Sequence, residues 1–222
     1  MFELSSSSVG GQELFVLPFG DIVDYFTPYT GALFLFALIF TIICIFSKPE
    51  KSMDVAFGTD AIFAKEVTGK DLHFRRFMAI ACGVATMGAV TSGDIFNFTL
   101  FVSMVAICII GLVASVKNRQ VLHTAFNYGI IAMLATVPLF GGAAITLAAT
   151  GTLSIWELSA IAPAMPWIAK AMLLVGVMGE GMAPFYVAKA ELTRAPGAPY
   201  VLMIHVSSLL MFLRVVEIIL TV

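Results

Sequence analysis

The chain has 222 residues, of which 60% are hydrophobic and only 12% are charged. Ordinary soluble domains carry about 25% charged residues, so this composition excludes a water-soluble globular protein and indicates one that lies in a lipid bilayer. The net charge of −2 provides no basic face, so we expect no nucleic-acid partner.

The N-terminal stretch 12–26 is apolar, but Pro18, Gly20 and several acidic residues interrupt it. It is therefore too irregular to cross a bilayer, and an apolar segment of this kind is typical of the membrane surface. We expect residues 1–27 to form an extracytoplasmic or surface segment.

The rest of the chain is predicted to be a helical bundle that occupies residues 28–222. A membrane-spanning helix needs about 20 mostly apolar residues. This length predicts six spans, at 28–47, 76–93, 95–116, 122–148, 164–187 and 200–221. The second and third spans meet at Gly93 and Asp94 with almost no loop, so we expect a tight helical hairpin there. The fold class is therefore an all-α, polytopic membrane bundle.

Basic residues test this topology independently, because short cytoplasmic loops retain Lys and Arg. Ten of the twelve basic residues fall in the alternate connections 48–76, 117–121 and 188–199, whereas the opposite loops contain none. This bias predicts a cytoplasmic loop at 48–75 and both termini on the other side. The two remaining basic residues, Lys170 and Arg214, are predicted to lie within the membrane zone.

Ionisable residues inside spans are candidates for an ion path, because burying a charge in hydrocarbon costs several kcal/mol. Glu180 lies in the fifth span beside Gly179, Gly181 and Pro184, which can loosen the helix and free backbone carbonyls. The alternative is a structural ion pair with another helix. Lys189, in the basic connection that follows, is a further candidate.

The last span carries three more candidates. His205 can relay a proton because histidine titrates near neutral pH, although a hydrogen-bonded packing role explains it as well. Arg214 and Glu217 are spaced i,i+3 and can form an ion pair on one helix face, which is compatible with a purely structural role.

Three candidates lie near the predicted span ends. His123 lies at the start of the fourth span, on the same helix face as Asn127. It is expected either to line the cytoplasmic entrance of an ion path or to contact lipid headgroups. Lys170 lies near the outer end of the fifth span and can extend its ammonium to the surface. Asp94 precedes an apolar helix, and capping that helix explains it without an ion-path role.

No pattern in the chain indicates a cofactor or a metal. Cys44, Cys82 and Cys108 each lie in an apolar run without Cys-x-x-Cys spacing or a neighbouring His, so they are expected to be small buried hydrophobic residues. Spacings for haem, flavin or an iron–sulfur cluster are also absent from the sequence. We expect no catalytic residues and no bound cofactor.

Three segments resemble one family in the same order along the chain. The first is Gly93-Asp94-Ile95-Phe96-Asn97, the second Thr150-Gly151-Thr152-Leu153, and the third combines Pro184, Ala198-Pro199 and His205. These are similar to motifs of the antiporter-like subunits of complex I and of Mrp-type cation/proton antiporters. The resemblance covers residues 76–215 and implies one five-helix repeat of that family, preceded here by an extra N-terminal helix.

The chain also departs from the family. A glutamate and a lysine of the family pair across the bundle to drive proton transfer, but Ser103 and Gly179 stand at those two positions here. Tyr186 stands where the family has His. The resemblance therefore implies the fold and the membrane setting, while the standard proton-pumping pair is absent.

A shortened chain of this kind resembles the small antiporter-like subunits of energy-converting hydrogenases of methanogenic archaea. This implies a multi-pass protein of the cell membrane that works with other membrane subunits of a [NiFe] hydrogenase complex, coupling H⁺ or Na⁺ translocation to ferredoxin and H₂ chemistry. Two alternatives stay open, namely a stand-alone or dimeric cation/proton antiporter and a scaffold subunit that conducts no ion.

Overall fold

The structure is a computed structural model that describes residues 15–19, 22–47, 52–57, 61–66, 69–115, 119–160, 164–180, 189 and 200–222. Its helices are α1 (Pro28–Phe46), α2 (Gly69–Thr91), α3 (Ile95–Ala114), α4 (Arg119–Thr150), α5 (Ile155–Ala160), α6 (Trp167–Gly179) and α8 (Tyr200–Thr221). Its strands are β1 (Phe15–Phe19), β2 (Ile22–Phe26), β3 (Ser52–Phe57) and β4 (Ala61–Glu66).

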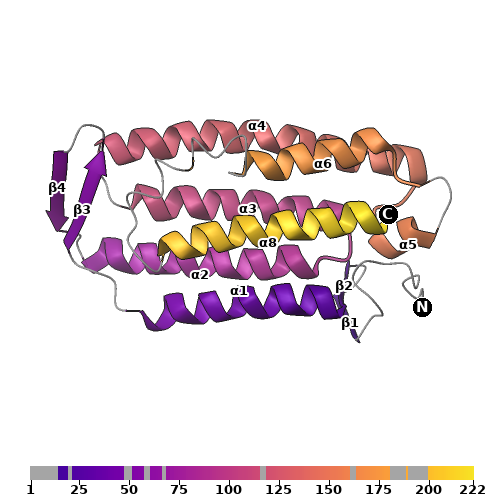
Figure 1. The fold of residues 1–222 in the computed structure, drawn as a ribbon, viewed down its shortest axis with the longest axis horizontal. Helices are drawn as coiled ribbons and strands as arrows, with labels where there is room; N and C mark the ends of the chain where they lie inside the picture. Colours follow the sequence, from indigo (N-terminus) through magenta and orange to yellow (C-terminus); the bar gives the residue numbers. More distant parts are fainter. Residues whose placement is uncertain are drawn as a thin grey trace.

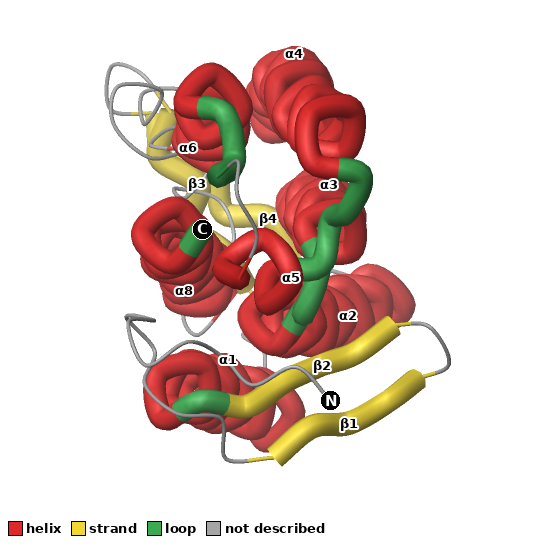
Figure 2. Tube along the Cα trace, turned by 90° about the vertical axis from the view of Figure 1, so that its right-hand side faces the viewer, coloured by secondary structure: helices red, strands yellow, loops and turns green. Residues whose placement is uncertain are grey.

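Six of the helices run side by side along the long axis of the molecule (Figure 1). Viewed end on, they form two rows, with α4, α3 and α2 in one row and α6, α8 and α1 in the other (Figure 2). Contacts between α4 and α6, between α2 and α8 and between α1 and α2 join the rows. The predicted helical bundle is therefore confirmed.

Each of the six predicted spans overlaps a helix, but four of the described helices qualify as membrane spans, and α2 and the shorter α6 do not. By length and composition, α1, α3, α8 and the segment Val121–Thr150 of α4 are apolar enough to cross a membrane. The second helix begins earlier than predicted, at Gly69, so Arg75 and Arg76 belong to its first turns. The described part of the fifth span is shorter than predicted, because α6 ends at Gly179; Pro184 and Tyr186 lie outside the described residues.

Two antiparallel hairpins, β1–β2 and β3–β4, lie at opposite ends of the bundle (Figure 1). The first falls within the predicted N-terminal segment, and the second falls within the predicted loop 48–75. Neither hairpin is predicted from the sequence. Both hairpins lie beyond the helix ends, so they add to the bundle without changing its architecture.

Two capping residues explain why α1 and α3 begin where they do. The Thr27 hydroxyl accepts a hydrogen bond from the Thr30 amide at 3.1 Å, and Pro28 occupies the first helical position. The Asp94 carboxylate accepts from the Asn97 amide at 2.8 Å, as the sequence predicts. The helical hairpin between α2 and α3 is thus fixed at Asp94.

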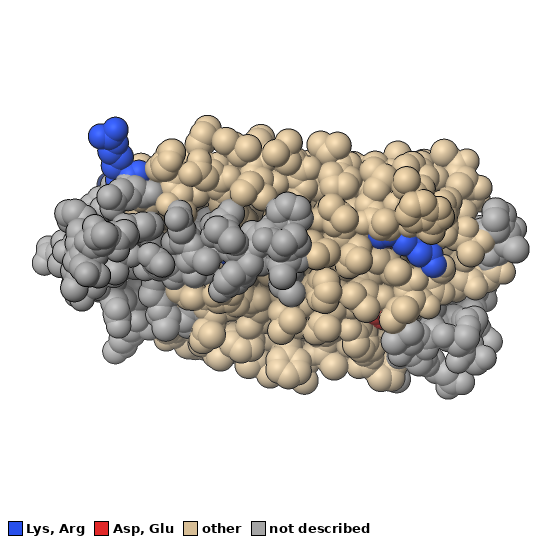
Figure 3. All heavy atoms as spheres, turned by 45° about the horizontal axis from the view of Figure 1, so that its top comes forward, with Lys and Arg blue, Asp and Glu red and all other residues tan. Residues whose placement is uncertain are grey.

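The outer surface of the bundle is strongly apolar. On α4, Phe126, Met133, Leu134 and Val137 are each about two-thirds exposed or more, with Met133 at 72%. The face shown in Figure 3 carries few charges among its described residues. Large contiguous apolar surfaces mark contact with lipid or with other protein, as expected for a multi-pass membrane protein.

Candidate functional site

A cluster of polar side chains lies inside the bundle where α6 ends. We call Glu180, Tyr128, Lys189 and Ser208 the inner cluster. Glu180 is the turn residue directly after α6, and its side chain is fully buried. The Tyr128 hydroxyl, from α4, donates to the Glu180 carboxylate over 3.0 Å.

The Lys189 ammonium is held by oxygens of two segments. It donates to the main-chain carbonyls of Glu180 and Ile204, each at 3.2 Å, and to the Ser208 hydroxyl. Ser208 in turn lies 3.2 Å from the Ile204 carbonyl and 3.4 Å from the Glu180 carbonyl, to which it can donate its one proton. The cluster therefore connects α4, the end of α6 and α8 through hydrogen bonds.

Burying the charged groups of the inner cluster costs free energy. Tyr128 lies about 14 Å along α4 from the first residue of that helix, inside the apolar stretch Val121–Thr150 that is long enough to cross a membrane. A charged group at such depth needs partners, or it costs several kcal/mol. Within the described residues, one oxygen of the Glu180 carboxyl group, Oε1, has no hydrogen-bond donor.

Other polar groups lie close to the inner cluster. Ser207, next to Ser208, lies with its hydroxyl 3.4 Å from the Cys82 thiol of α2. His205 is half-buried one position after Ile204 and lies within electrostatic range of Lys189. The structure thus brings three of the predicted residues, Glu180, His205 and Lys189, into one region.

Gly179 explains one departure from the family motif. A Cβ atom at this position would collide with the Cβ of Ala135 on α4, so any side chain here would require α6 and α4 to shift apart. The lysine that the resemblance implies at this position would therefore need a wider spacing between the two helices. Here an ammonium reaches the end of α6 from Lys189 instead.

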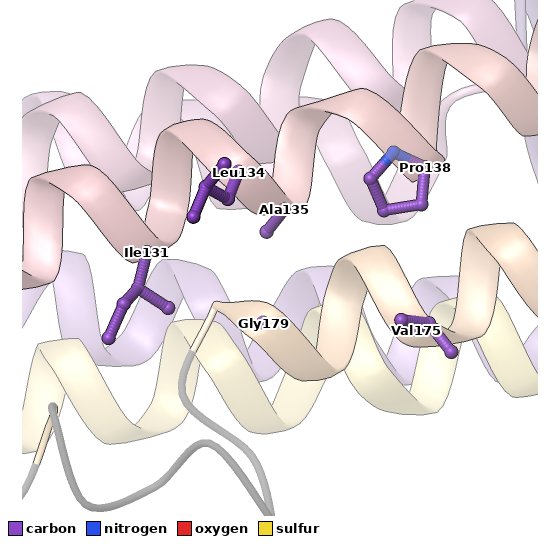
Figure 4. Close-up of a pocket in the computed structure, with 6 residues that line it drawn as sticks. All are labelled: Ile131, Leu134, Ala135, Pro138, Val175 and Gly179. Carbon is purple, nitrogen blue, oxygen red and sulfur yellow. The ribbon is translucent and has the colours of Figure 1, made fainter.

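An apolar groove of about 300 Å³ lies beside this contact, between α4 and α6 (Figure 4). It is lined by Ile131, Leu134, Ala135, Pro138, Val175 and Gly179. Since the lining is apolar, the groove itself offers no path for an ion. It lies at the level where α6 ends against α4.

A second group of buried charges lies nearer the C-terminal end of α8. We call Arg214, Glu217, Ser92 and Tyr29 the outer cluster. Arg214 and Glu217 form the predicted i,i+3 ion pair, and both side chains are buried. Arg214 also donates to the Ser92 carbonyl at 2.7 Å, and the Tyr29 hydroxyl donates to the Leu213 carbonyl at 3.0 Å. These bonds attach α8 to the α2–α3 connection and to α1.

The side chains between the two clusters on α8 are all apolar, from Leu209 to Leu213. Ser208 and Arg214 are separated by about 9 Å along the helix axis. Along α8, the described polar groups therefore form two separate clusters rather than one continuous row.

The remaining predicted residues have local roles at the helix ends. Asp94 caps α3. Beside it, the Ile95 amide donates to the Leu153 carbonyl at 3.0 Å, and the Ile155 amide donates to the Gly93 carbonyl at 2.9 Å. The Lys170 ammonium donates to the carbonyls of Ile219 and Val222 at the end of α8. His123 and Asn127 lie on the exposed face of α4, away from the inner cluster.

Sequence reasoning did not identify Tyr128 and Ser208. Tyr128 lies in an apolar helix 52 positions before Glu180, and Ser208 lies 28 positions after it. No short motif connects them. One available signal was the position of Ser208 within an otherwise apolar span, because a membrane-buried hydroxyl needs a partner.

Two relatives from Methanocaldococcus jannaschii are similar to this chain. The uncharacterized protein MJ0522 is 48% identical over 216 residues, which cover 97% of this chain and 99% of the relative. The uncharacterized protein MJ1309 is 30% identical over 130 residues, which cover 56% of this chain and 27% of the relative.

A solved structure of respiratory complex I from Thermus thermophilus with bound aureothin contains a similar chain. The TM-score is 0.49 at 17% sequence identity, over 83% of this chain and 47% of that chain. The model of the family described as "NADH dehydrogenase I, subunit N related protein" matches residues 3–222. Because this match spans nearly the whole chain, the protein belongs to the NADH dehydrogenase I subunit N-related family.

Proposed function

We propose that this chain is a membrane-arm subunit of an energy-converting [NiFe] hydrogenase complex in the cell membrane. In such a complex it contributes to coupling H⁺ or Na⁺ translocation to ferredoxin and H₂ chemistry. Membership of a family related to a membrane subunit of NADH dehydrogenase supports an antiporter-like role beside other membrane subunits. The sequence resemblance to the small antiporter-like subunits of methanogen energy-converting hydrogenases motivates the choice of complex.

The inner cluster is the observation that carries this proposal. A carboxylate and an ammonium are buried inside an apolar helical bundle, and both are held by neutral groups, namely a phenol, a hydroxyl and two carbonyls. Buried charges that serve only to join helices can often be replaced by apolar residues at little cost in stability. Ionisable side chains buried inside a membrane bundle are instead expected at a site through which a cation passes.

Each member of the inner cluster has a definite part in this proposal. Glu180 accepts the translocated cation or proton, and Tyr128 fixes the orientation of its carboxyl group. Lys189 supplies a positive charge near the end of α6, where Gly179 stands in place of the lysine of the family motif. The candidates for the approaches on either side are then His205, Asp94, Lys170, Arg214, Glu217 and His123.

The decisive experiment is Glu180→Gln in the intact complex. The amide keeps the size of the side chain but cannot carry the charge. We expect ion-coupled turnover to fall by about 100-fold or more, as is typical when a proton-transferring side chain is removed. Co-purification of the partner subunits, measured in mild detergent, is expected to stay unchanged.

Glu157→Gln is the matched control, because Glu157 bonds to Thr152 near the outer end and lies outside the inner cluster. It is expected to leave turnover near the wild-type value. Normal coupled turnover in an assembled Glu180→Gln complex would refute the proposal.

A scaffold subunit is the second candidate, and the apolar segment Leu209–Leu213 between the two clusters favours it. For that function, the chain would hold neighbouring subunits through its apolar faces and conduct nothing. Ion uptake by the purified chain alone in liposomes would instead support the stand-alone antiporter.

A further inference from the structure

The oxygens around Lys189 form a cage that suits a monovalent cation. Its members are the main-chain carbonyls of Glu180 and Ile204 and the hydroxyl of Ser208. The single proton of Ser208 points to one of these carbonyls, so a lone pair of its oxygen faces the ammonium. Main-chain carbonyl and hydroxyl oxygens are also the kind of ligand that binds Na⁺ in membrane proteins.

The fold makes these oxygens available. The Glu180 carbonyl lies just past the C-terminal end of α6, where helix carbonyls lack donors and the helix dipole is negative. Helix ends of this kind coordinate Na⁺ in membrane transporters. The backbone therefore presents a cation site whether or not Lys189 occupies it.

A further oxygen lies next to the cage. Tyr128 touches both the carboxylate of Glu180 and, at 3.5 Å, its carbonyl, so the carboxyl group lies beside the cage. Its Oε1 is buried and has no donor among the residues that the structure describes. A buried anionic oxygen without a donor attracts a cation more strongly than any neutral ligand.

We propose that this cage is a Na⁺ site, and that the Lys189 ammonium is its built-in competitor. The site holds one cation at a time, either the ammonium or Na⁺, because two positive charges beside a single carboxylate repel each other at this depth. Na⁺ enters as the ammonium leaves the same oxygens, so the net charge in the cage does not change. The inference rests on the proposed function and specifies the ion for it.

The test uses the full chain purified into lipid nanodiscs. Thermal unfolding is recorded at increasing NaCl, with choline chloride keeping the ionic strength constant. A cation that binds only the folded state raises the unfolding temperature in proportion to the logarithm of its concentration above the dissociation constant. We expect Na⁺ to raise the unfolding temperature of the wild-type chain.

Substitutions then identify the cage. Lys189→Met is expected to lower the half-saturating Na⁺ concentration by about tenfold or more, since every 1.4 kcal/mol of removed competition is tenfold in affinity. Adding Ser208→Ala to it is expected to raise that concentration again. Lys70→Met is the control, because Lys70 is exposed in the first turn of α2 and belongs to neither cluster. It is expected to keep the wild-type value.

The inference would be overturned if Na⁺ raised the unfolding temperature of neither the wild-type chain nor Lys189→Met. It would also be overturned if the two proteins had the same half-saturating Na⁺ concentration. If Lys189→Met does not fold, Lys189→Gln replaces it, because its amide still bonds to the carbonyls without a charge. A different result would refute the proposed function, namely normal coupled turnover in Glu180→Gln. If Na⁺ does not bind but Glu180→Gln still abolishes coupled turnover, the subunit role stands and the ion is H⁺.

Discussion

The inner and outer clusters both bury charged side chains between helices, but they satisfy those charges differently. In the outer cluster, Arg214 bonds directly to Glu217 and to the Ser92 carbonyl. In the inner cluster, the ammonium of Lys189 bonds to neutral oxygens, and one oxygen of Glu180 has no donor within the described part of the chain. A direct ion pair neutralises its own charges within α8, whereas separately held charges leave room for an ion.

The two clusters also respond differently when one helix shifts against its neighbours. Arg214 and Glu217 lie one turn apart on a single helix, so their pairing survives a shift of α8 against its neighbours. The inner cluster depends on three helices and on Lys189 at once. A small displacement of α6 would therefore change the ligands of the inner cluster but leave the outer ion pair intact.

The largest expected effect comes from breaking the outer pair. Glu217→Gln removes the carboxylate charge that pairs with the buried Arg214, which is expected to destabilise the protein by about 3–5 kcal/mol. Thermal or denaturant unfolding in detergent measures this. Replacing both residues, as Arg214→Met with Glu217→Leu, is expected to recover most of the loss. A stable Glu217→Gln protein that fails in ion-coupled turnover would instead make the outer cluster part of the ion path.

A smaller effect is expected where α6 packs against α4. Gly179→Ala forces a methyl group against Ala135, and overpacking of this kind typically costs about 1–3 kcal/mol. Ala135→Gly in the same chain is expected to restore the unfolding temperature, because it removes the opposing methyl. Lack of rescue would mean that the two helices do not meet as closely as they do in this structure.

The smallest expected effect is at Asp94. Asp94→Ala removes the cap of α3 and is expected to cost about 1 kcal/mol, whereas Asp94→Asn keeps an acceptor and is expected to be nearly neutral. Unfolding and coupled turnover should be measured on both variants. If Asp94→Asn is stable but loses turnover, its charge belongs to the ion path and the outer end is more than structural.

The sequence predicted the features that depend on local spacing. Helix length and hydropathy located the bundle, the position of Asp94 indicated a cap, and the i,i+3 spacing indicated the pair of Arg214 and Glu217. Each of these depends on residues within one turn of helix or one apolar run. The structure confirms them because such contacts are nearly independent of how the helices pack.

Features that depend on packing between helices were not predictable. Nothing local connects Glu180 with Tyr128 or Ser208, since these contacts arise only when α4, α6 and α8 come together. The exposure of His123 depends likewise on which face of α4 turns inward. The β3–β4 hairpin was not predictable from the basic residues of the loop 48–75, because charge indicates the side of the membrane and not the local backbone structure.

Pro138 weakens α4 close to Glu180. Proline has no amide hydrogen, so the Leu134 carbonyl lacks its usual partner one turn later in the helix. Both residues line the groove at the level where α6 ends. The hydrogen-bond ladder of α4 is thus weakened beside its contact with α6, and bending of α4 is least costly there. A neighbouring protein that pressed on α4 would therefore bend it first at Pro138, beside the groove.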